Sequence, residues 1–379
     1  MRKTFFSAAP IALLLFPLLA HTHLWLPSAS PADGVSAAVR ALALPPEPES
    51  VRQIRTRISE AKRLLASNPA PGAGSVRLAV GDETGGPVQL LTLPKETFLS
   101  KGAQAQVATS QGGTVSLRVE RANGVNTAVS ATGADGRKLL PLVVEYPIER
   151  NGEVTETAFY TAAHPALKSA EMADEGRQYV RRRLDEAAAR LEAKGVSVSP
   201  DIVNVAERLC LVEHADHKRF LSEDRGALLG EIETLYELNG GDTFRYSIST
   251  AGAGGMVQMI PKTYQAIREQ HPQAELNPDF IEGMRDHDNA AAAMLLYMQD
   301  TWDGLLKKDE VVGALKSGVA TQAELLAAGY NSNPVRLAKY LSRGGTSWRT
   351  LIPHETQMYL QIYAAFDRPA GDTPAQQQS

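Results

Sequence analysis

Glu213 is the residue whose type and surroundings point most clearly to chemistry. It follows the apolar run LCLV near the end of a predicted helix. A carboxyl group at the end of an apolar helical stretch is partly removed from water, and this raises its pKa. A carboxylic acid that stays protonated near neutral pH can act as a general acid. Taken alone, the same pattern is also that of an ordinary exposed residue on a helix face.

The glycine-rich stretch TAGAGGMVQMIP is the second candidate region. Gly252, Ala253 and Gly255 are small enough to let the backbone pass close to another chain, such as a polysaccharide. Gln258 is a lone amide in an apolar run, so it must find hydrogen-bond partners if it is buried. It can bind a sugar amide or hydroxyl, or it can hold the fold together. Pro261 suits the first turn of a following helix.

A third candidate region joins the stretch AAGYNSNPVRL to the last predicted helix. Tyr330 and Asn331 end one helix and open a turn, and Pro334 begins the next helix. Glu355 lies in the first turn of the last helix, where an acid interacts favourably with the helix dipole.

Taken together, the three regions resemble the lytic transglycosylase domain of the soluble-transglycosylase type, a family related to goose-type lysozyme. The family's pattern is a helix ending in Glu-Ser, then Gly-Ala-x-Gly-Leu-Met-Gln-x-x-Pro-x-Thr, then Ala-Tyr-Asn-Ala-Gly, and finally Glu-Thr-x-x-Tyr. The resemblance covers about 201–366, and the matching residues are Glu213; Gly252, Ala253, Gly255, Gln258, Pro261 and Thr263; Tyr330 and Asn331; and Glu355, Thr356 and Tyr359.

This resemblance implies cleavage of the β-1,4 bond between N-acetylmuramic acid and N-acetylglucosamine in peptidoglycan. Glu213 would first protonate the leaving oxygen and then, ionised, take the proton of the muramic 6-hydroxyl as a 1,6-anhydro ring closes. The sugar's own N-acetyl oxygen would stabilise the charge-deficient sugar. Neither a metal nor a cofactor is expected.

The resemblance also implies roles for the other matching residues. Tyr330 would hydrogen-bond near the acid or the acetamido group. Asn331 and Gln258 would position sugar groups, and the backbone around Ala253 would line the groove. Glu355 and the two matching glycines of the bend would support the site.

Several departures from the family's pattern leave a second hypothesis open. His214 stands where the family usually has serine, and positions 256–257 and 332–333 also differ. A long insert at 221–250 contains an extra predicted helix that can act as a lid. A non-catalytic peptidoglycan-binding or scaffold protein would keep the fold with such changes.

Two other hypotheses concern the chemistry itself. A hydrolytic lysozyme would let water attack, and a second acid in the groove, such as Glu223 or Asp242, would favour it. A metal site would use the stretch EHADH, although its histidines lie three residues apart and its glutamate precedes them, unlike the zinc-protease pattern. The aromatic side chains of Tyr246 and Trp348 can stack on sugars or serve in ordinary packing.

The sequence predicts a multidomain α+β protein, with a C-terminal all-α lysozyme-like domain preceded by a small antiparallel β module. The N-terminal stretch MRKTFFSAAPIALLLFPLLAHTH has the charge and apolar core of a secretory signal peptide, with an uncleaved anchor as the alternative. The expected segments are a signal peptide at 1–20, a flexible linker at 21–50, an amphipathic helix and linker at 51–74, the β module at 75–165, a connecting helix at 166–200, the lysozyme-like domain at 201–366 and a disordered tail at 367–379. Helices are expected in that domain at 202–221, 223–238, 261–270, 288–306, 321–328 and 353–366.

Composition narrows the compartment and the partners. The net charge of −4 over 379 residues argues against a nucleic-acid binder. Cys210 is the only cysteine, so no internal disulfide can form. After the N-terminal stretch, no segment approaches the ~20 apolar residues of a spanning helix. We therefore expect an exported periplasmic or envelope protein without a membrane span in its mature form, whose β module is a spacer or docks an envelope protein partner.

Overall fold

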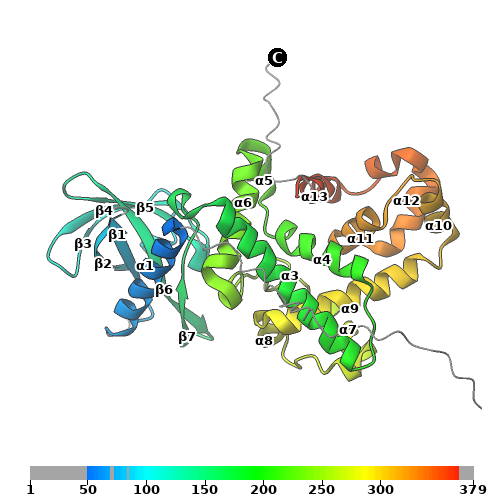
Figure 1. Ribbon diagram of the computed structural model, residues 1–379, viewed down its shortest axis with the longest axis horizontal. Coiled ribbons are helices and arrows are strands. Elements are labelled where there is room, and N and C mark those ends of the chain that lie inside the picture. The colour runs from blue at the N-terminus through cyan, green and yellow to red at the C-terminus, as the bar shows by residue number, and fades with distance from the viewer. Residues whose placement is uncertain (1–48, 69–71, 83–84, 367–379) are drawn as a thin grey trace, which may run out of the picture. The chain divides into compact units, whose positions relative to one another are not determined.

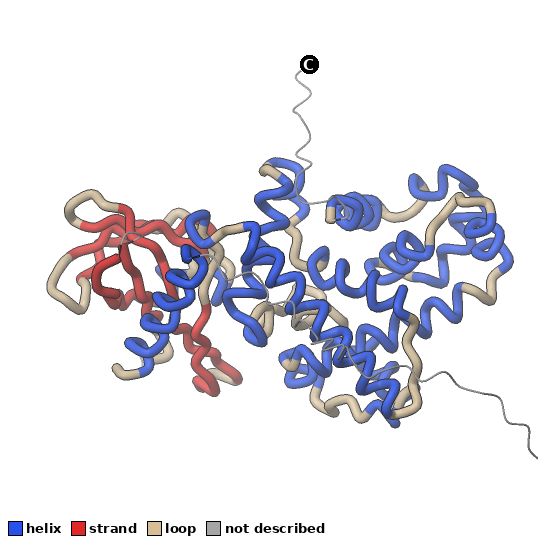
Figure 2. The backbone as a smooth tube through the Cα atoms, viewed as in Figure 1, coloured by secondary structure: helices blue, strands red, loops and turns tan. Residues whose placement is uncertain are grey.

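The computed structural model describes residues 49–68, 72–82 and 85–366. The predicted signal peptide, nearly all of the predicted linker and the predicted tail lie outside these residues. The described residues fall within one compact unit. They form an antiparallel sheet followed by a mostly helical C-terminal part, as Figures 1 and 2 show. This mixed architecture confirms the predicted order of sheet and helices.

The β module is a single curled sheet. Its order is β2-β1-β6-β5-β4-β3, with β7 paired to β6, and every pairing is antiparallel. An isolated bridge between Leu91 and Thr109 joins β2 to the segment just after β3, so the sheet curls back on itself. The strands are β1 (Ser75–Asp82), β2 (Gly85–Pro94), β3 (Gln104–Ala108), β4 (Thr114–Arg121), β5 (Ala128–Gly133), β6 (Lys138–Arg150) and β7 (Glu153–Tyr160).

Asp-Gly and Asn-Gly pairs, which favour tight hairpins, form two of the turns of the sheet. Gly136 lies in the turn between β5 and β6, and Asn151 and Gly152 lie in the turn between β6 and β7. All three residues have positive φ angles of 55° to 84°, which these residue types tolerate better than others.

Helix α1 (Glu49–Ala66) packs on this sheet through the apolar face predicted from its spacing. Val51, Ile58 and Leu65 are buried there with side chains of β1 and β6. Beneath the end of α1, the buried Arg77 pairs with Glu145 and donates to the Leu65 carbonyl at 2.8 Å.

The remaining helices mostly follow the sheet in the chain. A short helix, α2 (Lys95–Phe98), joins β2 to β3. The others are α3 (Ala170–Ala193), α4 (Pro200–Val212), α5 (His217–Ser222), α6 (Arg225–Asn239), α7 (Pro261–Gln270), α8 (Phe280–Arg285), α9 (His287–Leu305), α10 (Asp309–Lys316), α11 (Gln322–Asn331), α12 (Leu337–Gly344) and α13 (His354–Ala365). Helices α2, α8 and α10 go beyond those expected from the sequence, whereas the helix expected to begin at Pro334 is present as a 3-10 turn that leads into α12.

The single helix predicted at 202–221 is wrong, because the chain breaks into α4 and α5. Glu213 caps the C-terminus of α4, and its backbone N–H still donates to the Leu209 carbonyl at 3.0 Å. Asp216 then starts a new helix, since its carboxylate accepts hydrogen bonds from the backbone N–H groups of Lys218 and Arg219. The break leaves Glu213 at a helix end.

The extra helix predicted in the insert is present as α6, but it is a core helix and not a lid. Ten of its residues are buried. Its last residue, Asn239, accepts from the Thr161 N–H at 2.7 Å and donates to the Thr161 carbonyl at 3.0 Å. The helix is therefore fixed to the segment that leaves β7.

Helices α3 and α6 cross at very close range. A Cβ atom added to Gly176 of α3 would lie 1.8 Å from the backbone oxygen of Glu233 in α6. Only glycine fits this crossing without a shift of backbone atoms. As a separate finding, no helix within the described ranges is long and apolar enough to cross a membrane.

Replacing Gly176 by alanine is expected to lower the free energy of unfolding by about 3 kcal/mol, because the methyl group forces the two helices apart. The matched control is Gly230→Ala in α6, where an added Cβ meets nothing within 4 Å. Alanine there should leave stability unchanged or raise it by up to about 1 kcal/mol. Urea unfolding followed by circular dichroism measures both variants, and a Gly176→Ala protein as stable as its parent would contradict the close crossing.

Candidate functional site

Glu213 lies where α4, α13 and a glycine-rich loop meet. Apolar residues of the last turn of α4, Leu209 and Leu211 among them, are buried in the core. The Tyr359 hydroxyl, from α13, donates a hydrogen bond of 2.6 Å to Oε1 of Glu213. Tyr359 itself is buried. The carboxyl group thus sits at a helix end with one protein donor beside it.

This environment keeps the Glu213 carboxyl protonated at neutral pH. Burial is the largest cause and raises its pKa from 4.5 to about 8. The hydrogen bond from Tyr359 opposes the rise, and the negative charge of Glu355 adds to it. Glu355 is exposed in the first turn of α13, as predicted, and acts on Glu213 only through its charge.

The glycine-rich loop approaches the rest of the fold closely, at a position that requires glycine. Gly255 has a φ of 69°, and an added Cβ would lie 2.1 Å from the Met284 carbonyl oxygen. Gly252 also has a positive φ, of 78°. Ala253 is buried, and its N–H donates to the Ser249 hydroxyl at 3.0 Å. Gly255 and the buried Ala253 thus serve close packing within the protein.

Three successive carbonyl groups of this loop are held by side chains. Nε2 of Gln258 donates to the Gly255 carbonyl at 2.8 Å. The next carbonyl, of Met256, lies 3.0 Å from Nε2 of His214, and the one after it accepts from the Tyr330 hydroxyl at 2.6 Å. The loop is therefore fixed to the end of α4 and to α11.

His214 is neutral and structural in this arrangement. A carbonyl oxygen can only accept, so Nε2 of His214 must carry the proton. Burial lowers the His214 pKa to about 3. Its ring stacks on Phe244, with centroids 3.5 Å apart and planes 3° apart. Phe244 in turn has a positive φ of 55°, a strained conformation for an aromatic residue.

The two polar atoms of the Gln258 amide differ in their hydrogen bonding. Its Nε2 is used by Gly255 and, at 3.3 Å, by the Ser247 hydroxyl. Its Oε1 accepts no hydrogen bond from any described residue. The two roles that the sequence left open are thus divided between the two ends of one amide.

Tyr330 and Asn331 close α11, as predicted, but both side chains bond to protein groups. The Tyr330 hydroxyl donates its hydrogen bond to the Val257 carbonyl of the loop and not to Glu213. Oδ1 of Asn331 accepts from the Thr356 hydroxyl at 2.8 Å. These contacts tie together the regions that matched the family's pattern.

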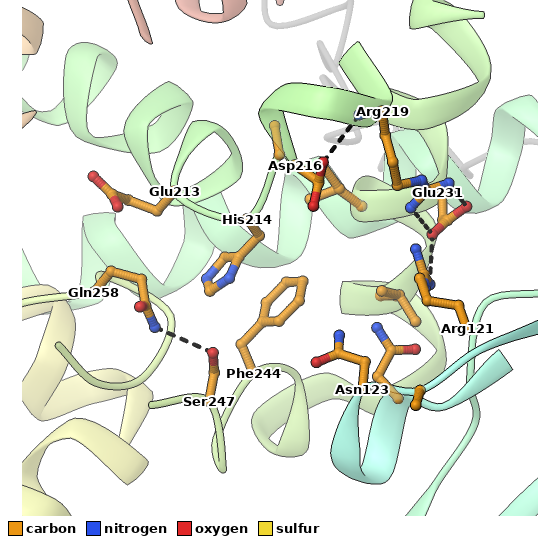
Figure 3. A pocket seen from close by; sticks show the side chains of 15 residues that line it. Arg121, Asn123, Glu213, His214, Asp216, Arg219, Glu231, Phe244, Ser247 and Gln258 are labelled. Carbon is orange, nitrogen blue, oxygen red and sulfur yellow. Dashed lines mark hydrogen bonds and ion pairs between the residues drawn. The ribbon is translucent and has the colours of Figure 1, made fainter. Parts of the chain in front are cut away.

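A polar cavity of about 400 Å³ opens beside Glu213. Of the predicted site residues, Glu213 and Gln258 line it, whereas Gly252, Ala253, Gly255, Tyr330, Asn331 and Glu355 do not. Figure 3 shows its walls, which come from the end of α4, the start of α5, the middle of α6, the loop around Ser247, and the β module. The lining includes Arg121, Asn123, Asn126, His214, Asp216, Arg219, Glu231, Phe244 and Ser247.

The other two carboxylates of the cavity already accept hydrogen bonds from protein groups. Asp216 caps α5. Glu231 is buried and receives both Nη groups of Arg219 at 2.9 Å and Nη2 of Arg121 at 3.1 Å. Although burial opposes it, these cations and Lys168 lower the Glu231 pKa to about 2. The pKa of Glu213 is thus raised, whereas that of Glu231 is lowered.

The alternatives considered for the chemistry find little support in the geometry. Neither Glu223 nor Asp242 lines the cavity. Trp348 is fully buried, and the Tyr246 hydroxyl donates to Glu156 at 2.7 Å. In the part of the chain that the structure describes, no group of three or more His, Cys, Asp or Glu side chains has a metal-binding arrangement.

Sequence reasoning assigned no role to several residues of the site. Tyr359 carried a signal, because it belongs to a matching element, four residues after Glu355 and so on the same helix face. The signal for His214 was its departure from serine. The lining residues of the β module, such as Asn123, carried none, since only the folded chain brings them to Glu213.

Comparisons with known proteins add no assignment. No protein-family model, no curated protein and no solved structure matched the chain.

Replacing Glu213 by glutamine is expected to stabilise the protein, and more so as the pH rises. The folded chain keeps this proton up to about pH 8, whereas the unfolded chain loses it near pH 4.5, so the parent's free energy of unfolding falls between these values. The neutral amide carries no such penalty. Calorimetric unfolding temperatures of the two proteins should diverge between pH 5 and pH 8 by about 2 °C or more. A difference that stays constant with pH would mean that the carboxyl group is well solvated.

Proposed function

We propose that the chain is a peptidoglycan lytic transglycosylase in which Glu213 is the single acid and base. The observation that carries the proposal is the Glu213 carboxyl, protonated at neutral pH, at the wall of a polar cavity. A general acid needs a pKa close to the working pH, and burial supplies it here.

The reaction begins with transfer of the Glu213 proton to the glycosidic oxygen between N-acetylmuramic acid and N-acetylglucosamine. As the bond from the muramic C1 to that oxygen breaks, the oxygen of the muramic N-acetyl group attacks C1. Glu213, now a carboxylate that accepts a hydrogen bond from Tyr359, then takes the proton of the muramic 6-hydroxyl. That oxygen displaces the acetamido oxygen at C1 and closes the 1,6-anhydro ring, so that Glu213 ends the cycle protonated, as it began.

The hydrogen bonds that the other two carboxylates accept from protein groups support a mechanism with one catalytic carboxyl group rather than two. Most glycosidases use a pair of carboxyl groups. Here Asp216 is engaged by backbone N–H groups and Glu231 by two arginines. Oε1 of Gln258 and the hydroxyl of Ser247 remain beside the cavity as polar groups for sugar contacts. The proposal also puts the protein in the periplasm or cell envelope, in agreement with the predicted signal peptide.

Digestion of purified peptidoglycan tests the reaction. We expect muropeptides with 1,6-anhydromuramic ends from the parent protein and at least 100-fold less product from Glu213→Gln, because the amide can neither give nor take the proton. Glu223→Gln is the matched control, an exposed acid outside the cavity, and should digest like the parent. Mass spectrometry reads the ends.

Two other results of this digest would replace the proposal. Reducing ends would mean that water attacks and that the protein is a hydrolytic lysozyme. Binding of peptidoglycan without cleavage by either protein would favour the non-catalytic scaffold.

Tyr359→Phe is expected to shift the alkaline limb of the pH–rate profile upward. Activity requires protonated Glu213, so kcat/KM of the parent should fall above about pH 8. The Tyr359 hydroxyl stabilises the ionised carboxylate, and its removal raises the Glu213 pKa further. Tyr330→Phe is the matched control, because that hydroxyl bonds the Val257 carbonyl and its loss should leave the limb in place. Identical alkaline limbs for all three proteins would count against Glu213 as the titrating acid.

A further inference from the structure

The β module contributes a wall to the cavity that contains Glu213. The end of β4 and the 3-10 turn after it (Gly124–Asn126) supply Arg121, Asn123 and Asn126. In the view of Figure 3, Asn123 lies across the cavity from Glu213, with Phe244 between them. A module expected to be a spacer or a docking surface thus lines the same cavity as the candidate catalytic residue.

This wall is held rigidly by its own hydrogen bonds. The buried Thr127 hydroxyl accepts from the Asn123 N–H at 2.9 Å and donates to the Gly124 carbonyl at 2.8 Å. Asn126 is buried, and its Oδ1 accepts from the Ala163 N–H at 3.3 Å. The backbone that presents Asn123 is therefore set before any ligand arrives.

An ion cluster fixes the wall against the helical part. Arg121, the last residue of β4, shares the buried carboxylate of Glu231 in α6 with Arg219 of α5. Charged pairs buried in this way are costly to separate, because each partner would be left uncompensated. The distance from the wall to Glu213 is thus set by α4, α5 and α6 together.

The Asn123 amide is available for a ligand. Its side chain is exposed and forms no hydrogen bond with any described residue. Across the cavity, Oε1 of Gln258 likewise accepts none. A side-chain amide offers two donors and an acceptor. An acetamido group offers one donor and one acceptor, so two amides facing one cavity suit an N-acetylated sugar.

We infer that the β module forms part of the glycan-binding site. In this site, the Asn123 side chain hydrogen-bonds an N-acetylated sugar that lies between Asn123 and Gln258. This inference rests on the proposed function. It assigns substrate binding to both parts of the chain, so the helical part alone has an incomplete site.

Titration calorimetry with glycan strands tests it. The ligand is peptidoglycan glycan from which an amidase has removed the peptides, and the protein carries Glu213→Gln to prevent cleavage. Adding Asn123→Ala should weaken binding about fivefold, the worth of one neutral hydrogen bond. The matched control is Gln104→Ala, an exposed amide of β3 outside the cavity, which should leave the Kd unchanged. In the cleaving protein, Asn123→Ala should raise KM by a similar factor while the alkaline limb of the pH–rate profile stays in place.

The outcomes separate this inference from the proposed function. Unchanged binding and KM in Asn123→Ala, with anhydro products still formed, would overturn the inference and leave the function standing. Equal weakening by Gln104→Ala would also overturn it, since the effect would then be general to the module. Neither binding nor cleavage of glycan by any of the proteins would overturn both.

Discussion

Three polar side chains of α6 constrain the whole molecule, because each is bonded to a group of another element. Glu231 is paired with Arg219 and Arg121, and Asn239 with the backbone of Thr161. The Tyr236 hydroxyl donates to a carbonyl in the last turn of α4 at 3.1 Å. One helix thereby fixes the sheet, α4 and α5 to one another. An error in its position would leave several buried groups unpaired at once, each at a cost of about 1–3 kcal/mol.

The chemistry at Glu213 follows from this fixed frame. The break between α4 and α5 turns a helix residue into a helix end, and the buried last turn removes its carboxyl from water. The Tyr359 hydroxyl donates a hydrogen bond to the Glu213 carboxyl, and the Tyr330 hydroxyl donates one to a carbonyl of the glycine-rich loop. The proposed acid is thus a consequence of packing, and no cation of the described residues is among the groups that shift its pKa.

The sequence predicted what depends on local pattern. The amphipathic helix α1, the antiparallel β module and the partly desolvated position of Glu213 were all predicted from spacing or from neighbouring residue types. The α4–α5 break was missed because apolar residues continue on both sides of it, and only the Asp216 cap ends the pattern. The wall around Asn123 could not be foreseen, because the β4 turn meets α4 only through contacts distant in sequence. Whether the helical part has the lysozyme-like fold stays a prediction.

The fixed carbonyls of the glycine-rich loop affect how a ligand can be received. With the loop bonded by Gln258, His214 and Tyr330, and its backbone against Met284, this side of the cavity has little conformational entropy left to lose. A ligand binding there gives up mainly its own freedom. A flexible glycan must therefore supply most of the conformational adjustment on binding. Any distortion of its sugar ring results from contact with this rigid loop.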